Sequence, residues 1–67
     1  MIDARGLVCP MPVVMARNEV KANAPEALEI LVDNRAAVEN LTRFGGSCGY
    51  RVRVEAQGED YLVCLTK

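Results

Sequence analysis

The sequence contains neither histidine nor tryptophan, and aromatic residues make up only 4% of it. Without histidine, a serine or cysteine nucleophile would have no imidazole base of the kind that many hydrolases use. The three cysteines, Cys9, Cys48 and Cys64, are widely separated, so no closely spaced pair is present for zinc or for thioredoxin-like dithiol chemistry. We therefore expect neither a metal site nor a resident cofactor.

Long apolar runs and an excess of positive charge are also missing. No stretch approaches the roughly 18 apolar residues of a membrane-spanning helix, and Asp3 and Arg5 interrupt the N-terminus where a signal peptide would be apolar. The formal net charge is -1 with both signs interspersed, so no basic face is available for nucleic acid. We expect a cytoplasmic protein with no membrane and no direct nucleic-acid partner, and the odd number of cysteines suits a reducing compartment.

The composition, 51% hydrophobic and 25% charged, is that of a folded chain, and the length predicts a single domain over residues 1–67. Apolar periodicities predict strands over 1–5, 27–32, 50–56 and 61–66 and helices over 12–23 and 35–44. This βαβαββ order predicts an α/β two-layer sandwich, in which a mixed four-stranded sheet carries both helices on one face.

Two finer expectations concern the second half of the chain. Asp33 and Asn34 are both suitable N-caps for the second helix, and Gly45 is expected to end it in the left-handed conformation, with GGSCG as a loop. In the third strand, apolar residues alternate with charged ones and are expected to form a buried face. These apolar residues are Tyr50, Val52, Val54 and Ala56.

Residues 6–14 read GLVCPMPVV and place a thiol between an apolar run and two closely spaced prolines, ahead of a helix. Pro10 disfavours helical backbone at Cys9, and Pro12 suits the first turn of the helix that follows. The unpaired N–H groups and the positive dipole end of that helix favour a thiolate at Cys9. With no acid–base partner, the chemistry left to this thiolate is displacement at sulfur, by which it accepts a sulfur atom from a persulfide and passes it on.

The stretch DARGLVCPMPVV, with its cysteine-proline-x-proline core, resembles the start of the TusA/SirA family of small sulfur-carrier proteins. The resemblance implies the βαβαββ fold and a cysteine that receives sulfur as a persulfide from a cysteine desulfurase and passes it to an acceptor. By position this cysteine is Cys9. The motif and partner-docking segment that the resemblance implies comprises Gly6, Leu7, Pro10, Met11 and Pro12.

The segment VDNRAAVENLTRF is similar to the YedF subgroup, proteins of selenium or sulfur metabolism whose chains often continue into a DsrE-like domain. This similarity implies a DsrE-like acceptor and leaves sulfur and selenium open as cargo. Asn34 and Arg35 differ from the acidic residue and proline that carriers for tRNA thiolation have at these positions, which argues against that role.

Other interpretations stay open beside the carrier. The chain could be a non-catalytic interaction or regulatory module in which Cys9 and its prolines only shape a helix entry. An RNA-binding role rests on fold analogy alone, and the charge balance counts against it. Cys48 is either a loop thiol without a function or a resolving or sulfur-receiving thiol, and Cys64 is expected to be structural. A carrier must release its partners, so we expect a monomer or a weak dimer.

Overall fold

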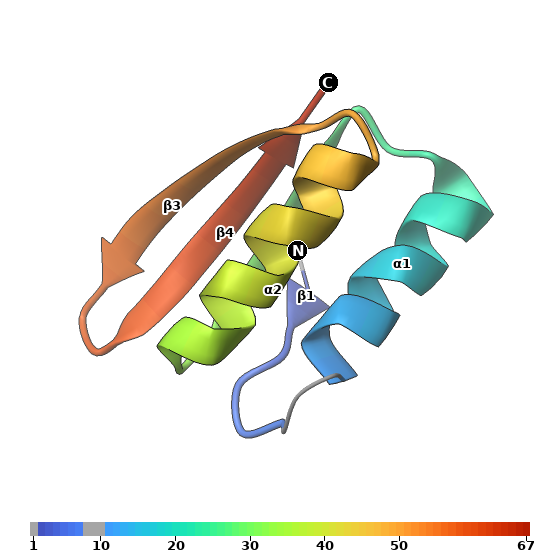
Figure 1. Ribbon diagram of the computed structural model, residues 1–67. Coiled ribbons are helices and arrows are strands. Elements are labelled where there is room, and N and C mark those ends of the chain that lie inside the picture. The colour runs from blue at the N-terminus through green and yellow to red at the C-terminus, as the bar shows by residue number, and fades with distance from the viewer. Residues whose placement is uncertain (1, 8–10) are drawn as a thin grey trace.

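The computed structural model describes residues 2–7 and 11–67, which form four strands and two helices in the order βαβαββ (Figure 1). The strands are β1 (Ile2–Asp3), β2 (Ala27–Val32), β3 (Arg51–Gln57) and β4 (Asp60–Thr66), and the helices are α1 (Met11–Asn23) and α2 (Arg35–Ser47). The predicted order of elements is confirmed, and α1 begins one residue earlier than predicted. Within this described part of the chain, neither helix has the length and apolar character needed to cross a membrane.

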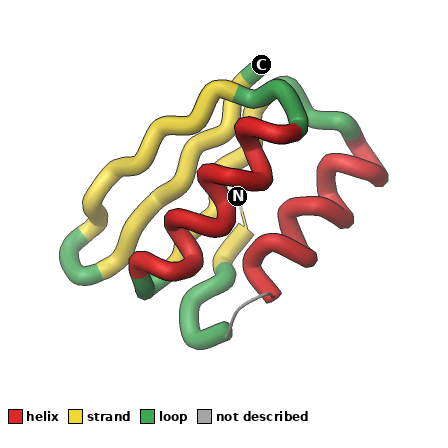
Figure 2. Tube along the Cα trace, viewed as in Figure 1, coloured by secondary structure: helices red, strands yellow, loops and turns green. Residues whose placement is uncertain are grey.

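The four strands form one mixed sheet in the order β1-β2-β4-β3. β1 runs parallel to β2, as expected for strands joined through a helix, whereas β4 runs antiparallel to both β2 and β3. Both helices lie on the same face of the sheet, and the other face is left uncovered (Figures 1 and 2). The predicted α/β two-layer sandwich is thus confirmed.

The core lies between the helices and the two central strands. In β2, Leu28, Ile30 and Val32 are buried beneath the helices, whereas the residues that alternate with them are exposed or half-buried. Val63 and Leu65 of β4 are their neighbours in the same layer. The further buried hydrophobic residues of this core are Ala4, Ala16, Ala37, Leu41 and Tyr50.

The buried face predicted for the third strand is only partly present. Tyr50, just before β3, is buried and donates a hydrogen bond from its hydroxyl to the Pro25 carbonyl at 2.7 Å, and Val52 is half-buried. Val54, by contrast, is 41% exposed, and Ala56 is exposed too. The prediction was wrong for these two residues because β3 is an edge strand of the sheet, and the helices cover the inner strands (Figure 1).

Gly45 does not end α2, contrary to the prediction, and lies buried inside the last part of the helix. A Cβ atom on Gly45 would lie 2.7 Å from Leu65 Cδ2 and 2.9 Å from Val52 Cγ2, so the glycine lets the helix approach the sheet closely. The left-handed residue is instead Gly49 (φ +84°), after which the Tyr50 N–H donates to the Gly45 carbonyl at 2.9 Å, as in a Schellman C-cap.

Candidate functional site

The loop that leads to the predicted nucleophile leaves the sheet where β1 and β2 end. Parallel neighbouring strands have their carboxyl ends at the same edge of a sheet, so the loops after them lie close together. Ala4 is the last residue held by the sheet, since its N–H donates to a β2 carbonyl at 2.8 Å. Cys9 and Pro10 lie outside the described residues, and the site is therefore built from residues 6–7 before them and 11–12 after them.

Asp33 fixes this loop to the end of β2. Its Oδ2 accepts a hydrogen bond from the backbone N–H of Gly6 at 2.8 Å, and its Oδ1 accepts one from the side-chain amide of Asn34 at 3.1 Å. The Gly6 N–H, and then the Asn34 amide, lower the pKa of the Asp33 carboxyl below its ordinary value. The carboxylate thus stays charged at neutral pH and holds Gly6, whose φ of +78° suits glycine. We call this contact the Asp33 latch.

Arg5 braces the same loop from the other side. Its Nε and Nη2 donate to Oδ1 and Oδ2 of Asp3, both at 3.0 Å, and its Nη1 reaches Oδ2 of Asp60 at 3.4 Å. The hydrogen bonds from Arg5 lower the pKa of Asp3, and those to Asp3 raise the pKa of Arg5. Arg5 therefore connects the loop to β1 and to the start of β4.

The start of α1 forms the second half of the site. Met11, the first residue of the helix, is 43% exposed, whereas the side chain of Pro12 is fully buried. The first turn contains no acidic side chain, so no carboxylate there neutralises the positive end of the helix dipole. Pro12 anchors the helix start, and Met11 presents a flexible apolar side chain to solvent.

The predicted docking segment is thus divided between exposed and buried residues. Gly6 and Met11 are exposed, whereas Leu7 packs against the core and Pro12 is buried. The sequence does not predict the latch, because its pattern assigns Asp33 only the role of a possible helix N-cap. Its position at the carboxyl end of a strand parallel to β1 is the signal that could have revealed it.

Cys48 lies far from this loop along the sheet. It is exposed and caps the C-terminal end of α2, two residues before Tyr50, whose hydroxyl bonds to Pro25 ahead of β2. Gly6, in contrast, is bound to Asp33, which follows β2. The Cys48 segment and the latched loop are therefore at opposite ends of that strand (Figure 1).

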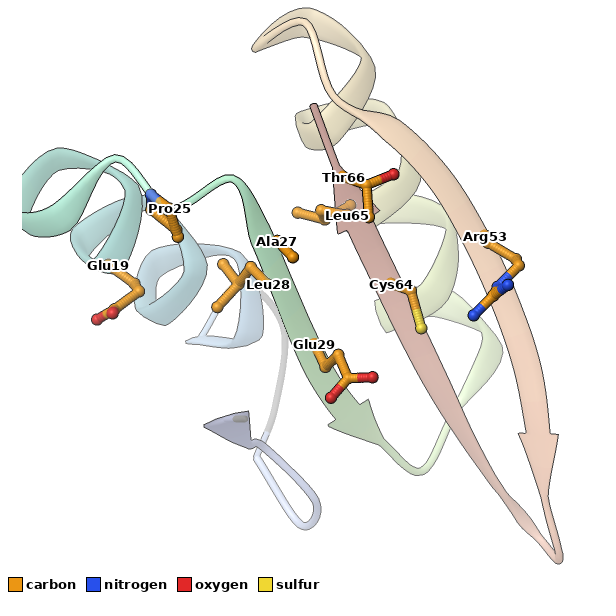
Figure 3. A pocket seen from close by; sticks show the side chains of 9 residues that line it. All are labelled: Glu19, Pro25, Ala27, Leu28, Glu29, Arg53, Cys64, Leu65 and Thr66. Atoms are coloured by element: carbon orange, nitrogen blue, oxygen red, sulfur yellow. The ribbon is translucent and has the colours of Figure 1, made fainter.

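Cys64 lines a pocket of about 300 Å³ that extends from the uncovered face of the sheet to Glu19 of α1 (Figure 3). Its side chain is only 5% exposed and stands between Glu29 of β2 and Arg53 of β3, its partners in the sheet register. The pocket contains none of the described site residues, so it is separate from the latched loop. Across residues 2–7 and 11–67, no three or more potential ligands are grouped to hold a metal ion.

These features define a class of small two-layer α/β proteins in which a cysteine-proline segment runs from a braced loop into the first helix. Over residues 1–67 the sequence matches the family described as "Sulfurtransferase TusA", and the chain belongs to this family. The resemblance of the cysteine-proline segment to TusA/SirA proteins is thereby confirmed.

Individual relatives agree with this assignment. "Putative sulfur carrier protein MJ0990" of Methanocaldococcus jannaschii is 34% identical over 67 residues, which cover 98% of this chain and 89% of that protein. "Putative sulfur carrier protein YrkF" of Bacillus subtilis is 36% identical over 61 residues, covering 88% of this chain, which spans only 33% of YrkF. The crystal structure of a SirA-like protein from Desulfitobacterium hafniense superposes with a TM-score of 0.84 at 30% identity, over 96% of this chain and 90% of that one. The narrower similarity to the YedF subgroup stays a prediction.

Proposed function

We propose that this protein is a sulfur carrier that holds sulfur as a persulfide on Cys9 between a donor protein and an acceptor protein. Membership in the TusA family and the names of its relatives support a sulfur-carrier role. The observation that carries the assignment to Cys9 is that the residues on both sides of its segment are fixed, Gly6 by the Asp33 latch and Pro12 by burial. A segment anchored at both ends needs little further ordering when a partner docks.

Each transfer is a displacement at sulfur that consumes no external oxidant or reductant. The Cys9 thiolate attacks the outer sulfur of a persulfide on the donor. A new sulfur–sulfur bond forms to Cys9, the donor's own sulfur–sulfur bond breaks, and the donor cysteine leaves as a thiolate. An acceptor thiolate then attacks the outer sulfur held on Cys9. A new sulfur–sulfur bond forms to the acceptor, the bond to Cys9 breaks, and Cys9 leaves as a thiolate.

The neighbouring residues have distinct roles in this proposal. The sequence predicts that Pro10 disfavours a helical backbone at Cys9, and the buried Pro12 anchors the start of the helix that follows. Met11 offers partners an adaptable apolar contact, because it is exposed and unbranched. Gly6 and Leu7 shape the approach to the thiol, Gly6 at the surface and Leu7 from the core side.

A cysteine desulfurase-like protein is the proposed donor and a DsrE-like protein the proposed acceptor. Neither needs nucleic acid or a membrane for the exchange, which requires only that a thiolate on one protein meets a persulfide on the other. The cytoplasm suits this chemistry, because thiols there are kept reduced. Selenium would follow the same route if the donor carried it as a perselenide, because an attacking thiolate displaces the outer selenium atom in the same way.

The test incubates the chain with a cysteine desulfurase and cysteine and then measures its intact mass. We expect the mass of one added sulfur atom, removable by a thiol reductant, in the wild type and in Cys48→Ser but not in Cys9→Ser. Circular dichroism would establish that all three proteins are folded. Equal loading of Cys9→Ser would overturn the proposal and leave a non-catalytic interaction module as the better interpretation.

A further inference from the structure

The outer edge of the sheet at β3 (Arg51–Gln57) has no strand beside it among the described residues. β3 pairs with β4 along its whole length on one side and is open on the other (Figures 1 and 2). Val54, at its centre, is one of two large hydrophobic side chains that are exposed in the described part of the chain, the other being Met11 in the functional site. A long open strand edge with an exposed apolar centre is a template for pairing with another strand.

The hairpin that joins β3 to β4 determines which residues offer their backbone groups to such a partner. Gln57 pairs with Asp60 across a two-residue turn that begins with Gly58 at φ +66°. In such a turn the closing pair is hydrogen-bonded, so the backbone N–H and C=O groups of Gln57 point toward β4. Alternation from Gln57 then directs the N–H and C=O groups of every second residue outward. These outward-facing residues are Val52, Val54 and Ala56.

The charges of β3 favour a second copy of the same strand as the partner. If two β3 strands pair antiparallel with Val54 opposite Val54, then Arg53 of each copy lies opposite Glu55 of the other. These charged residues occupy the positions between the hydrogen-bonded ones, where opposing side chains come closer. Arg53 and Glu55 lie on the same face of the strand, because Arg53 Nη2 is 3.7 Å from Glu55 Oε1 within one copy. Both side chains are exposed, that of Arg53 to 73% and that of Glu55 to 45%.

The same pairing also joins the apolar face of β3. Val54 would cover its counterpart at the two-fold axis, and Val52 would lie opposite Ala56 of the second copy. Of the neighbouring registers that keep the hydrogen bonds, one places Arg53 opposite Arg53, although it also places Arg51 opposite Glu55, and the other places Glu55 opposite Glu55. Like charges directly opposite are destabilising, and only the register centred on Val54 has none. The register centred on Val54 is therefore the one in which charge and apolar contacts agree.

We propose that β3 is a self-association edge, at which two copies of the chain pair antiparallel across Val54 and continue one sheet into the other. The contact involves one strand from each copy and is smaller than a standard interface of about 1,600 Å². The dimer is therefore weak and concentration-dependent. The latched loop follows β1, at the opposite side of the sheet, so it stays accessible in the dimer. This proposal does not depend on the chemistry of Cys9.

The test is sedimentation equilibrium of the reduced full chain from about 10 μM to about 1 mM, a range that covers weak association. We expect a reversible monomer–dimer equilibrium in the wild type. Arg53→Glu and Glu55→Arg each place like charges opposite each other and should raise the dissociation constant at least about tenfold. The double variant Arg53→Glu/Glu55→Arg restores opposite charges and should return the constant to within about threefold of the wild type.

Arg43→Glu, at an exposed position of α2, is the matched control, because it changes the net charge as Arg53→Glu does but lies outside β3. It should leave the dissociation constant unchanged. A wild type that remains monomeric at about 1 mM would overturn the proposal. So would a dimer that is insensitive to the two single reversals, or one that the double variant fails to recover. Circular dichroism of each variant separates these results from loss of folding.

Discussion

Asp33 and Asn34 are adjacent residues with side chains of similar size, yet they stabilise different parts of the molecule. Asn34 caps α2, and its Oδ1 accepts the Ala37 N–H at 2.8 Å. Asp33 accepts the Asn34 amide on Oδ1 and holds the Gly6 N–H with Oδ2. The sequence predicts that one of them caps the helix, because both have a suitable oxygen. It cannot assign the other to the loop, because Gly6 is 27 residues away in the chain and approaches only after β1 and β2 have paired.

The two residues can therefore be separated by experiment. Asp33→Ala removes the latch, and we expect sulfur loading on Cys9 to slow by roughly threefold to tenfold, because the thiol segment is held less closely in place. Asn34→Ala removes the cap and one hydrogen bond to Asp33 but keeps the contact between Asp33 and Gly6. It should lower the free energy of unfolding by about 1 kcal/mol and slow the loading less than Asp33→Ala does. Stopped loading reactions analysed by intact mass, together with urea denaturation, measure both quantities. If Asp33→Ala loads as fast as Asn34→Ala, the latch has no role in transfer.

α2 shows why the end of a helix is harder to predict than its existence. Its apolar spacing predicts the helix, but Gly45 has two possible meanings in a sequence, a left-handed C-cap or a site of close packing. The structure has the second, because Leu65 and Val52 occupy the space beside Gly45. The left-handed position falls on Gly49 instead. Only the partner strands, which come later in the chain, decide between the two glycines.

Gly45 and Gly46 provide a matched pair within this helix. Gly45→Ala should lower the free energy of unfolding by about 1–3 kcal/mol, because the added Cβ meets the fully buried Leu65 and the stiff, β-branched Val52. Gly46→Ala should raise it by about 0.5–1 kcal/mol, because nothing lies within 4 Å of the added Cβ and alanine favours helix. Thermal unfolding of both variants would show shifts of opposite sign. Shifts of the same sign would contradict the packing described for Gly45.

More of the overall fold than of the candidate site could be predicted from the sequence. Apolar residues predict strands over 27–32 and 61–66, and these strands, β2 and β4, are the central pair of the sheet. Alternation in β3 predicts a buried face that is absent at Val54, because a period of two does not show which strand is outermost. The contact between Arg5 and Asp60, 55 residues apart, likewise depends on the final positions of the strands.

Acid should weaken the folded state through the two carboxyls at the loop. Hydrogen bonds from Arg5 lower the pKa of Asp3, and that from Gly6 lowers the pKa of Asp33. A carboxyl with a lower pKa in the folded state binds fewer protons there than in the unfolded state. It therefore stabilises the folded state at pH values above its pKa in the unfolded state, and this stabilisation is lost as the pH falls through its pKa in the folded state. We therefore expect the free energy of unfolding to decrease below about pH 4.

The double variant Asp3→Asn/Asp33→Asn should show a shallower decrease than the wild type, because two of the groups that take up protons on unfolding are gone. Urea denaturation from about pH 7 to about pH 2 measures the slopes. Glu39→Gln, an exposed change on α2, should keep the wild-type slope. An unchanged slope in the double variant would show that the contacts of these carboxylates do not persist in solution.

The passage of one labelled sulfur atom through the chain decides whether it is a carrier. Radiolabelled cysteine and a cysteine desulfurase would load the protein, and the donor would then be removed before a DsrE-like acceptor is added. We predict that peptide mapping finds the label on the fragment containing Cys9 alone and that the label then moves to the acceptor. Label on the Cys48 fragment, or label that stays on the chain when a competent acceptor is present, would contradict a relay through Cys9.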